Sequence, residues 1–291
     1  MIESRDEKTS HGTAPVVTEK RPSRMQWMRM PVTGWIGGLL VLFWTLISLF
    51  GPWLAPHDPS ALLSDQVLGP MTDQYVFGTD FLGRDVLSRL LDGTRYTVGL
   101  ALIAALLACL LGGALGLFTS LAHRWVEEPV SRVVDAIISI PSKMLALVMV
   151  SVFGSGVDQL IITAVVAYFP GAYRIARSLA MNLVQMEYVD AARTRGEGRL
   201  YVAVMEMLPN MLMPMLTDLG MRFVFIVLLL SGMSFLGLGV QPPAADLGSL
   251  VKENISGLSQ GSPAVLIPAL AIGSITIGVN LLIDAFGAKR R

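Results

Sequence analysis

Four charged side chains stand close together between the first two long apolar runs, and their types would allow two kinds of chemistry. Asp80 and Asp85 supply carboxylates that could bind a metal ion, and Arg84 and Arg89 alternate with them. Opposite charges four residues apart pair on one face of a helix. Because acid and base alternate, the pattern favours internal ion pairs on a short, solvated helix at the outer surface over a metal site.

Other residues that perform chemistry are sparse and scattered. His11, His57 and His123 form neither an HExxH nor an HxxxH pair, and the one cysteine, Cys109, excludes an intrachain disulfide and a zinc site built on several thiols. No GxxxxGK[ST] sequence occurs, and the dipeptide Gly-Lys is absent. The chain therefore lacks a P-loop, and we expect no catalytic centre, metal or cofactor in it.

The composition shows what kind of elements must position these residues. Of 291 residues, 53% are hydrophobic and 15% are charged, and apolar runs of roughly 18 residues or more recur. This is the profile of an all-α integral membrane protein. The formal net charge is zero, so no basic field argues for a nucleic-acid partner, and membrane lipid is the expected surrounding.

Six membrane spans are predicted, at residues 32–54, 97–121, 136–153, 160–173, 212–238 and 262–283. The fourth is the shortest, with Pro170 and Gly171 near its end. Pro141 near the start of the third predicts a kink or break. Gly34 and Gly38 form a GxxxG pattern in the first span, and Gly112, Gly113 and Gly116 give the second a smooth packing face.

The distribution of basic residues sets the expected orientation. With six spans, 17 of the 22 Lys and Arg residues lie in the segments on one side and four on the other. Because positive residues concentrate on the cytoplasmic side, both termini are predicted to be cytoplasmic. Residues 1–31 are interpreted as a disordered cytoplasmic tail and 285–291 as a short cytoplasmic tail.

Two further patterns fall around the fifth span. Arg222 is a charge in an apolar run, which marks a functional site by default, but Asp218 stands four residues earlier, so we favour a structural ion pair over a substrate contact. Six methionines surround the same span, and thioethers bind soft metals such as copper. Adaptable packing is the simpler explanation of Met205, Met207, Met211, Met213, Met215 and Met221.

The longest polar interlude between two apolar runs in the second half of the chain is residues 187–210, EYVDAARTRGEGRLYVAVMEMLPN. Gly196 and Gly198 divide it into a short helix and a second helix that enters the membrane, with Leu200, Val204 and Leu208 at i, i+4 and i+8. A mixed-charge helix–turn–helix between two spans suggests a knob that docks into another protein.

This segment resembles the EAA loop of the inner-membrane permeases of ABC importers. The resemblance rests on Asp190, Ala191 and Ala192, then Gly196 after three residues, then Leu208 and Pro209 ending thirteen residues beyond the glycine. Asp190 stands where the family usually has Glu, and Glu206 where a hydrophobic residue or His is common. The resemblance implies that Glu187, Asp190, Ala191, Ala192, Gly196, Leu208 and Pro209 couple the membrane helices to an ATP-hydrolysing subunit.

A second resemblance narrows the family. FGTDxLGRDxLSRLL is similar to the signature of the C-type permeases of dipeptide, oligopeptide and nickel importers, and so is SFLGLGVQPP at 234–243. The signature residues before the second span are Gly78, Thr79, Asp80, Gly83, Arg84 and Asp85. Family members often have Trp where this chain has Leu247.

The resemblance implies the type I ABC importer permease fold and an organisation in four parts. After the 1–31 tail come the first span with a periplasmic segment (32–95), a five-helix permease core (96–284) that holds the 187–210 coupling loop, and the 285–291 tail. The implied partners are a homologous permease subunit, two ATPase subunits that bind ATP and Mg, and a periplasmic substrate-binding protein, all at the bacterial inner membrane.

The substrate-binding residues stay unknown, and several functions stay open. Peptides come first, and nickel, a metallophore complex, opines and glutathione are alternatives within the family. A proton- or sodium-driven carrier would need carboxylates at the membrane midplane, and none stands out in the first, second, third or sixth span. A membrane enzyme would need clustered His, Asp or Ser, which is absent. A non-transporting scaffold is disfavoured by the 187–210 spacing.

Overall fold

The structure is a computed structural model that describes residues 31–288. Residues 1–30 of the predicted N-terminal tail and residues 289–291 lie outside the described range. Within it every regular element is a helix, as the composition predicts. The last helix, α10 (Pro263–Ala288), continues into the predicted 285–291 tail.

Five helices are long and apolar enough to cross a membrane: α1 (Val32–Leu54), α2 (Val86–Ser120), α5 (Val157–Val184), α8 (Leu208–Phe235) with the turns before it, and α10. A sixth span results if α3 (Arg124–Ile138) and α4 (Ser142–Phe153) count as one. The all-helical membrane class is therefore confirmed, with five candidate spans among the described residues, or six if the bent pair is one span.

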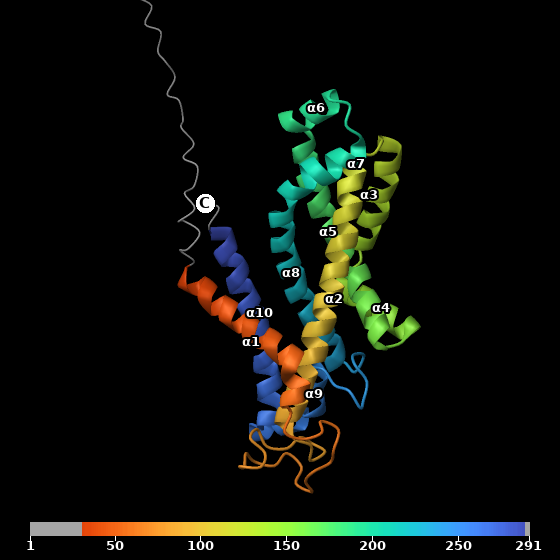
Figure 1. Cartoon of the computed structure of the whole chain (residues 1–291). Coiled ribbons are helices and arrows are strands. Elements are labelled where there is room, and N and C mark those ends of the chain that lie inside the picture. The colour runs from red at the N-terminus through yellow and green to blue at the C-terminus, as the bar shows by residue number, and fades with distance from the viewer. Residues whose placement is uncertain (1–30, 289–291) are drawn as a thin grey trace, which may run out of the picture. The chain divides into compact units, whose positions relative to one another are not determined.

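Figure 1 shows how the helices are arranged within the described range. α6 (Glu187–Thr194) and α7 (Arg199–Tyr201) lie at one end of the bundle, and α9 (Leu247–Glu253) lies at the other. We call these the α6 end and the α9 end. α2 and α8 run between the two ends, and α1 packs alongside α10. A 3-10 turn, η3 (Ile255–Gln260), joins α9 to α10.

The third span, predicted at 136–153 with a kink or break at Pro141, does not follow the predicted bounds. α3 begins much earlier, with His123 as its N-cap, and it bends by 87° into α4. Pro141 causes the break that the sequence predicted, because it cannot continue the α3 hydrogen-bond ladder and instead precedes the first turn of α4. Residues 124–135, predicted as a polar loop, are helical because their apolar side chains recur at helical spacing, with Val134 buried.

The fourth span is twice the predicted length. The prediction ended it at Tyr173, but α5 continues to Val184 with Pro170 in its interior. Packing overrides the Pro-Gly signal here. Ala176 and Ala180 are fully buried in the second half of α5, and α2 packs most extensively against this helix. Gly112 and Gly116 allow that approach, since a Cβ on Gly116 would lie 2.8 Å from the Tyr173 carbonyl oxygen.

The bounds of α2 and α8 also differ from the prediction, and α1 differs in which glycine makes its close contact. α2 begins at Val86 rather than near 97, because Asp85 accepts a hydrogen bond from the Ser88 amide and caps the helix. α8 ends at Phe235 rather than 238. α1 has the predicted bounds, but Gly37, outside the Gly34/Gly38 pattern, makes the close approach to α10.

The buried apolar side chains form two clusters. The larger one lies toward the α9 end and contains residues of α2, α5, α8 and α10 such as Ala104, Leu160 and Val227. The smaller one lies under the α6 end and joins Leu117 and Ala176 to Val189, Met207 and Met211. The smaller cluster is what holds the 187–210 segment on the bundle.

Candidate functional site

The first half of the 187–210 segment is a capped helix followed by a glycine turn. α6 ends with Arg195 as its C-cap, and Gly196 adopts φ +84°. The Gly196 amide donates to the Arg193 carbonyl at 3.0 Å, and the Glu197 amide donates to the Ala192 carbonyl at 3.2 Å. These two bonds form a Schellman motif, in which glycine is preferred because L side chains are strained at positive φ. The predicted division at Gly196 is correct.

The second half contains a π-helix that the sequence analysis missed. α7 leads into η2 (Val202–Met207), and α8 begins with Leu208 and Pro209. A π-helix has a longer period than an α-helix, so the buried face moves off the predicted stripe. Val202, Met207 and Met211 are buried, whereas Leu200 of the predicted i, i+4, i+8 stripe is 65% exposed.

The segment therefore has an inner and an outer face. Val189 and Ala192 of α6 are fully buried within the smaller apolar cluster, together with residues of α2, α5, η2 and α8. Most predicted coupling residues face away from the bundle: Glu187, Asp190, Ala191, Gly196 and Pro209 are exposed, Leu208 is half-buried, and Ala192 belongs to the inner face. Exposed apolar side chains join the outer face at Leu200 and Met205.

One ion pair joins the two halves of the segment, and a second lies within α6. Arg195 Nη2 lies 3.3 Å from Glu206 Oε1 across the glycine turn, and Arg193 Nη1 lies 3.7 Å from Asp190 Oδ1. Asn210 Nδ2 donates to the Glu206 carbonyl at 2.8 Å. Glu206, the departure from the EAA pattern, thus has a partner inside the segment.

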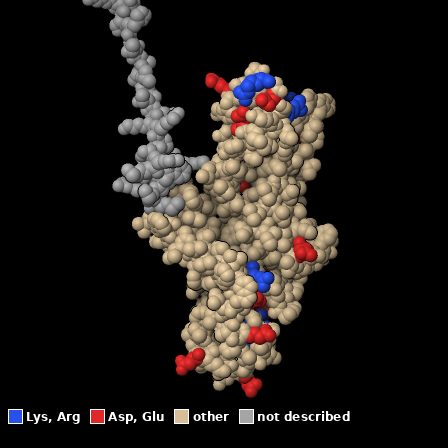
Figure 2. All heavy atoms as spheres, viewed as in Figure 1, with Lys and Arg blue, Asp and Glu red and all other residues tan. Residues whose placement is uncertain are grey.

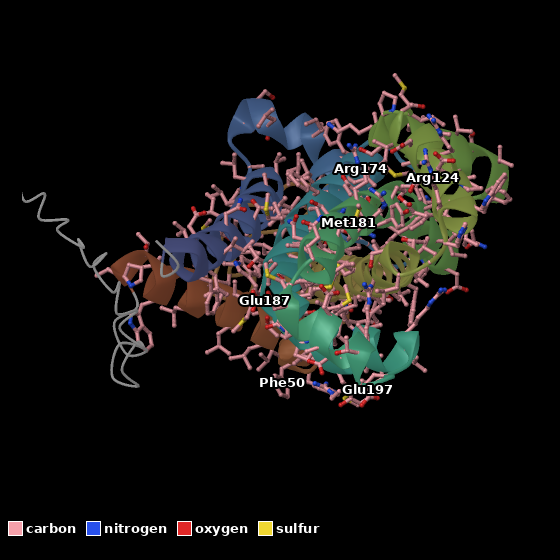
Figure 3. All side chains as sticks on the ribbon, turned by 90° about the horizontal axis from the view of Figure 1, so that it is seen from above. Phe50, Arg124, Arg174, Met181, Glu187 and Glu197 are labelled. Atoms are coloured by element: carbon pink, nitrogen blue, oxygen red, sulfur yellow. The ribbon has the colours of Figure 1, made fainter. Side chains whose placement is uncertain are left out.

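Charge gathers at this end of the molecule. Figure 2 shows Lys, Arg, Asp and Glu side chains at the α6 end and others toward the α9 end, with a mostly uncharged surface between them. In Figure 3, which looks onto the α6 end, Glu187 and Glu197 lie on one side of the view and Arg124 and Arg174 on the other. A charged end above an apolar body is the distribution expected where a membrane helix bundle meets water.

The signature residues before α2 form a buried cluster of turns, which corrects the prediction of a solvated surface helix. Gly78 and Gly83 both have φ +75°, so residues 78–85 form turns. A Cβ on Gly83 would collide with the Ser64 carbonyl oxygen. Thr79 Oγ1 accepts from the Gly69 amide and donates to the Gln66 carbonyl, both at 2.8 Å.

The charges of these turns pair with one another, as predicted, but they are buried. Asp80 Oδ2 lies 2.8 Å from both Arg84 Nε and Arg89 Nη1. A fourth member, Glu253 of α9, completes the group at 3.0 Å from Arg84 and 2.6 Å from Arg89. The group joins the 78–89 segment to α9, and Glu253 gave no signal in the sequence. Two guanidinium groups bind the Asp80 carboxylate, and the Asp85 carboxylate caps α2. Both carboxylates therefore have structural partners.

No group of three or more His, Cys, Asp or Glu side chains suited to a metal ion occurs among residues 31–288. The methionines around α8 diverge, since Met207 and Met211 are buried while Met205 and Met213 are exposed. The Asp218–Arg222 pair forms as predicted, with Arg222 Nε 2.6 Å from Asp218 Oδ2.

These features, a polar segment seated at one end of a broken six-span bundle, agree with what comparison of the sequence shows. The chain belongs to the family of binding-protein-dependent transport system inner membrane components, whose model matches residues 108–291, and it is therefore a membrane permease subunit rather than a catalytic one. A second model, the N-terminal TM domain of oligopeptide transport permease C, matches residues 32–74. The C-type assignment is thus confirmed, and the protein is a multi-pass component of the inner membrane.

Individual relatives agree with this assignment. The chain is 31% identical over 255 residues to a dipeptide transport system permease protein of Haemophilus influenzae, covering 86% of each chain. It is 32% identical over 274 residues to a putative peptide transport system permease protein of Brucella suis, covering 94% of this chain and 90% of the relative. It is also 32% identical over 252 residues to a nickel transport system permease protein of Escherichia coli, covering 85% and 89%.

Proposed function

We propose that this chain is a permease subunit that carries peptides across the bacterial inner membrane, driven by ATP hydrolysis in partner subunits. The observation that carries the proposal is the 187–210 segment. It presents Glu187, Asp190 and Ala191 on an exposed outer face, while Val189 and Ala192 are buried in the smaller cluster with residues of α5 and α8. A docked subunit that moves this segment would also move the two helices flanking it.

The proposed assembly follows the family pattern. A homologous permease subunit pairs with this chain, two ATPase subunits bind at the α6 ends and hold ATP and Mg, and a periplasmic binding protein delivers substrate at the α9 end. The α6 end and both termini then face the cytoplasm. ATP binding closes the ATPase pair and rocks the permease subunits between inward-open and outward-open states. This chain itself holds no cofactor.

Peptide as the substrate is supported by the relatives of Haemophilus influenzae and Brucella suis, whose names give dipeptide and peptide transport. Nickel is the second candidate, supported by the Escherichia coli relative. The two candidates are distinguished with the purified complex, to which binding protein loaded with dialanine or with nickel is added. Only binding protein that carries the true substrate class should stimulate ATP hydrolysis.

The coupling role is tested with two glycines that differ in backbone conformation alone. A Cβ on Gly196 or on Gly198 would meet no atom within 4 Å, but Gly196 has φ +84° while Gly198 has φ −72°. A side chain in the left-handed region costs about 1–2 kcal/mol. We therefore expect Gly196→Ala to reshape the turn and Gly198→Ala to act as its control.

The measurement is ATPase subunit co-purification together with the stimulation of hydrolysis by peptide-loaded binding protein. Gly196→Ala should weaken stimulation about fivefold to thirtyfold, as expected of 1–2 kcal/mol, with Gly198→Ala near the wild type. Equal stimulation in all three proteins would show that the segment does not couple.

A further inference from the structure

The two apolar clusters are separated by a polar junction. On α8 the smaller cluster ends at Met211 and the larger one begins at Phe223. Asp218 and Arg222 lie between them and are 7% and 6% exposed. The matching level of α5 is Tyr168 to Gly171. We call Asp218, Arg222, Tyr168 and Gly171 the Arg222 junction.

Arg222 makes contacts in both helices. Its Nε and Nη2 bind Asp218 of the same helix at 2.6 and 3.0 Å, and its Nη1 donates to the Tyr168 carbonyl of α5 at 2.8 Å. Tyr168 forms a second link between the two helices. Its hydroxyl donates to the Phe225 carbonyl at 3.2 Å, and its ring stacks on Phe225. These are hydrogen bonds that tie α5 directly to α8.

The rest of the junction makes room for this link and weakens α5 beside it. A Cβ on Gly171 would lie 2.9 Å from Arg222 Nη1, so the missing side chain leaves space for the guanidinium. Pro170 lacks the amide that would complete the α5 ladder at this level. Arg222 of α8 therefore binds α5 at the level where the Pro-Gly pair interrupts the α5 backbone hydrogen bonds.

The position of the junction in the chain gives it a mechanical meaning. α5 and α8 are the two helices that flank the 187–210 segment, so displacement of that segment enters the bundle through them. Because the junction lies between the two clusters, motion of the α6 end that travels along α5 and α8 passes this link before it reaches the α9 end. A buried, bidentate arginine pair is geometrically specific and suits a fixed joint.

We propose that Arg222 is a positioning residue for transport: by fixing α5 to α8 between the two clusters, it makes the 187–210 segment and the α9 end move as one unit. The inference rests on the proposed function, since it needs ATP-driven motion of the segment. Loss of the link should leave ATP hydrolysis intact and separate it from movement at the α9 end.

Gly171→Ala is the most selective test, because it displaces Nη1 from Tyr168 and leaves the Asp218 pair in its own helix. Gly232→Ala is the matched control, a glycine in α8 where a Cβ meets no atom within 4 Å. Arg222→Lys keeps the charge beside Asp218 but lacks the planar fork that reaches two helices.

Each variant is reconstituted as the full complex with its ATPase and binding-protein partners. One readout is dialanine transported per ATP hydrolysed. The other needs no substrate: the change in labelling rate at Ser256→Cys, an exposed position at the α9 end, on trapping with ATP and vanadate.

We expect Gly171→Ala and Arg222→Lys to lower both readouts by about 2-fold to 30-fold, the range that substitutions in coupled networks produce. Basal hydrolysis and complex yield should match those of Gly232→Ala. Wild-type readouts in Gly171→Ala would overturn the inference while leaving the proposed function standing. If the protein with Ser256→Cys as its only substitution shows no ATP-dependent change in labelling rate, both the inference and the proposed function are overturned.

Discussion

At the scale of single residues, charges that look solvated in the sequence form a buried group of ion pairs in the structure. Asp80 and Arg89 are 1% and 3% exposed, and their partner Glu253 is 164 residues away from Arg89 in the chain. Alternating acids and bases indicated the internal pairing correctly. Burial could not be predicted, because it depends on α9 closing over the segment.

Glu253 should therefore be worth more to stability than an exposed acid. Glu253→Ala leaves two buried guanidinium groups with one carboxylate, and breaking a buried pair costs about 3–5 kcal/mol. Because Glu253 retains 18% exposure, we expect the lower end of that range. The measurement is the melting temperature of the detergent-solubilised complex.

Glu128→Ala is the control for that experiment. Glu128 pairs with Arg124 at 3.2 Å, but the two side chains are 57% and 81% exposed, and such pairs contribute about 0–1 kcal/mol. Equal melting temperatures for the two variants would contradict the structural role of the buried group.

At the scale of elements, apolar runs predicted where helices exist better than where they end. The bounds of α1 were predicted correctly because Trp, Gly and Pro bracket a charge-free run. α5 was cut short at Tyr173 because Arg174 and Arg177 look like a loop. In the structure, Arg177 pairs with Glu127 of α3, and the Tyr173 hydroxyl lies 2.7 Å from Ser131 Oγ. Contacts with another helix, unreadable from local sequence, extend α5.

The same limit applies to the 187–210 segment. Gly196 as a turn residue followed from its type, and the helices on either side followed from periodicity. The π-helix did not, because its longer period arises only when Val202, Met207 and Met211 seat together in the smaller cluster. For that reason the buried face does not follow the predicted stripe of Leu200, Val204 and Leu208. The functional role given to the outer face rests on resemblance and awaits the Gly196 experiment.

The contact of α1 with α10 provides a test at this scale. A Cβ on Gly37 would lie 2.7 Å from the Leu282 amide nitrogen and 2.8 Å from the Gly278 carbonyl oxygen, both backbone atoms, whereas Gly38 has only Leu282 Cδ1 at 3.8 Å. Overpacking costs about 1–3 kcal/mol. Gly37→Ala should lower the melting temperature of the complex and Gly38→Ala should not. The reverse order would show that the two helices do not cross at Gly37.

At the scale of the whole molecule, the fold is a transport subunit whose two ends are expected to lie in different compartments. The fold class and family could be read from the sequence, because hydropathy and two spaced motifs are local signals. The orientation rests on the charge distribution, and it remains part of the proposal.

Cysteine mapping checks that orientation. Asp73 and Thr194 are exposed, at the α9 end and the α6 end, and Cys109 is buried. In a chain with Cys109→Ala, a membrane-impermeant maleimide added to cells with a permeabilised outer membrane should label Asp73→Cys. Thr194→Cys should react only after the inner membrane is opened. Labelling in the opposite order would invert the topology.

The buried charge group also has a consequence for synthesis. Asp80, Arg84 and Arg89 leave the ribosome together, as two cations and one anion, while Glu253 follows 164 residues after Arg89. At a synthesis rate of about 5–20 residues per second, the wait is roughly 10–30 s. During that time Arg84 and Arg89 share the Asp80 carboxylate without Glu253. The α9 end of the nascent chain therefore stays incomplete until α9 emerges, when nearly the whole protein has been made.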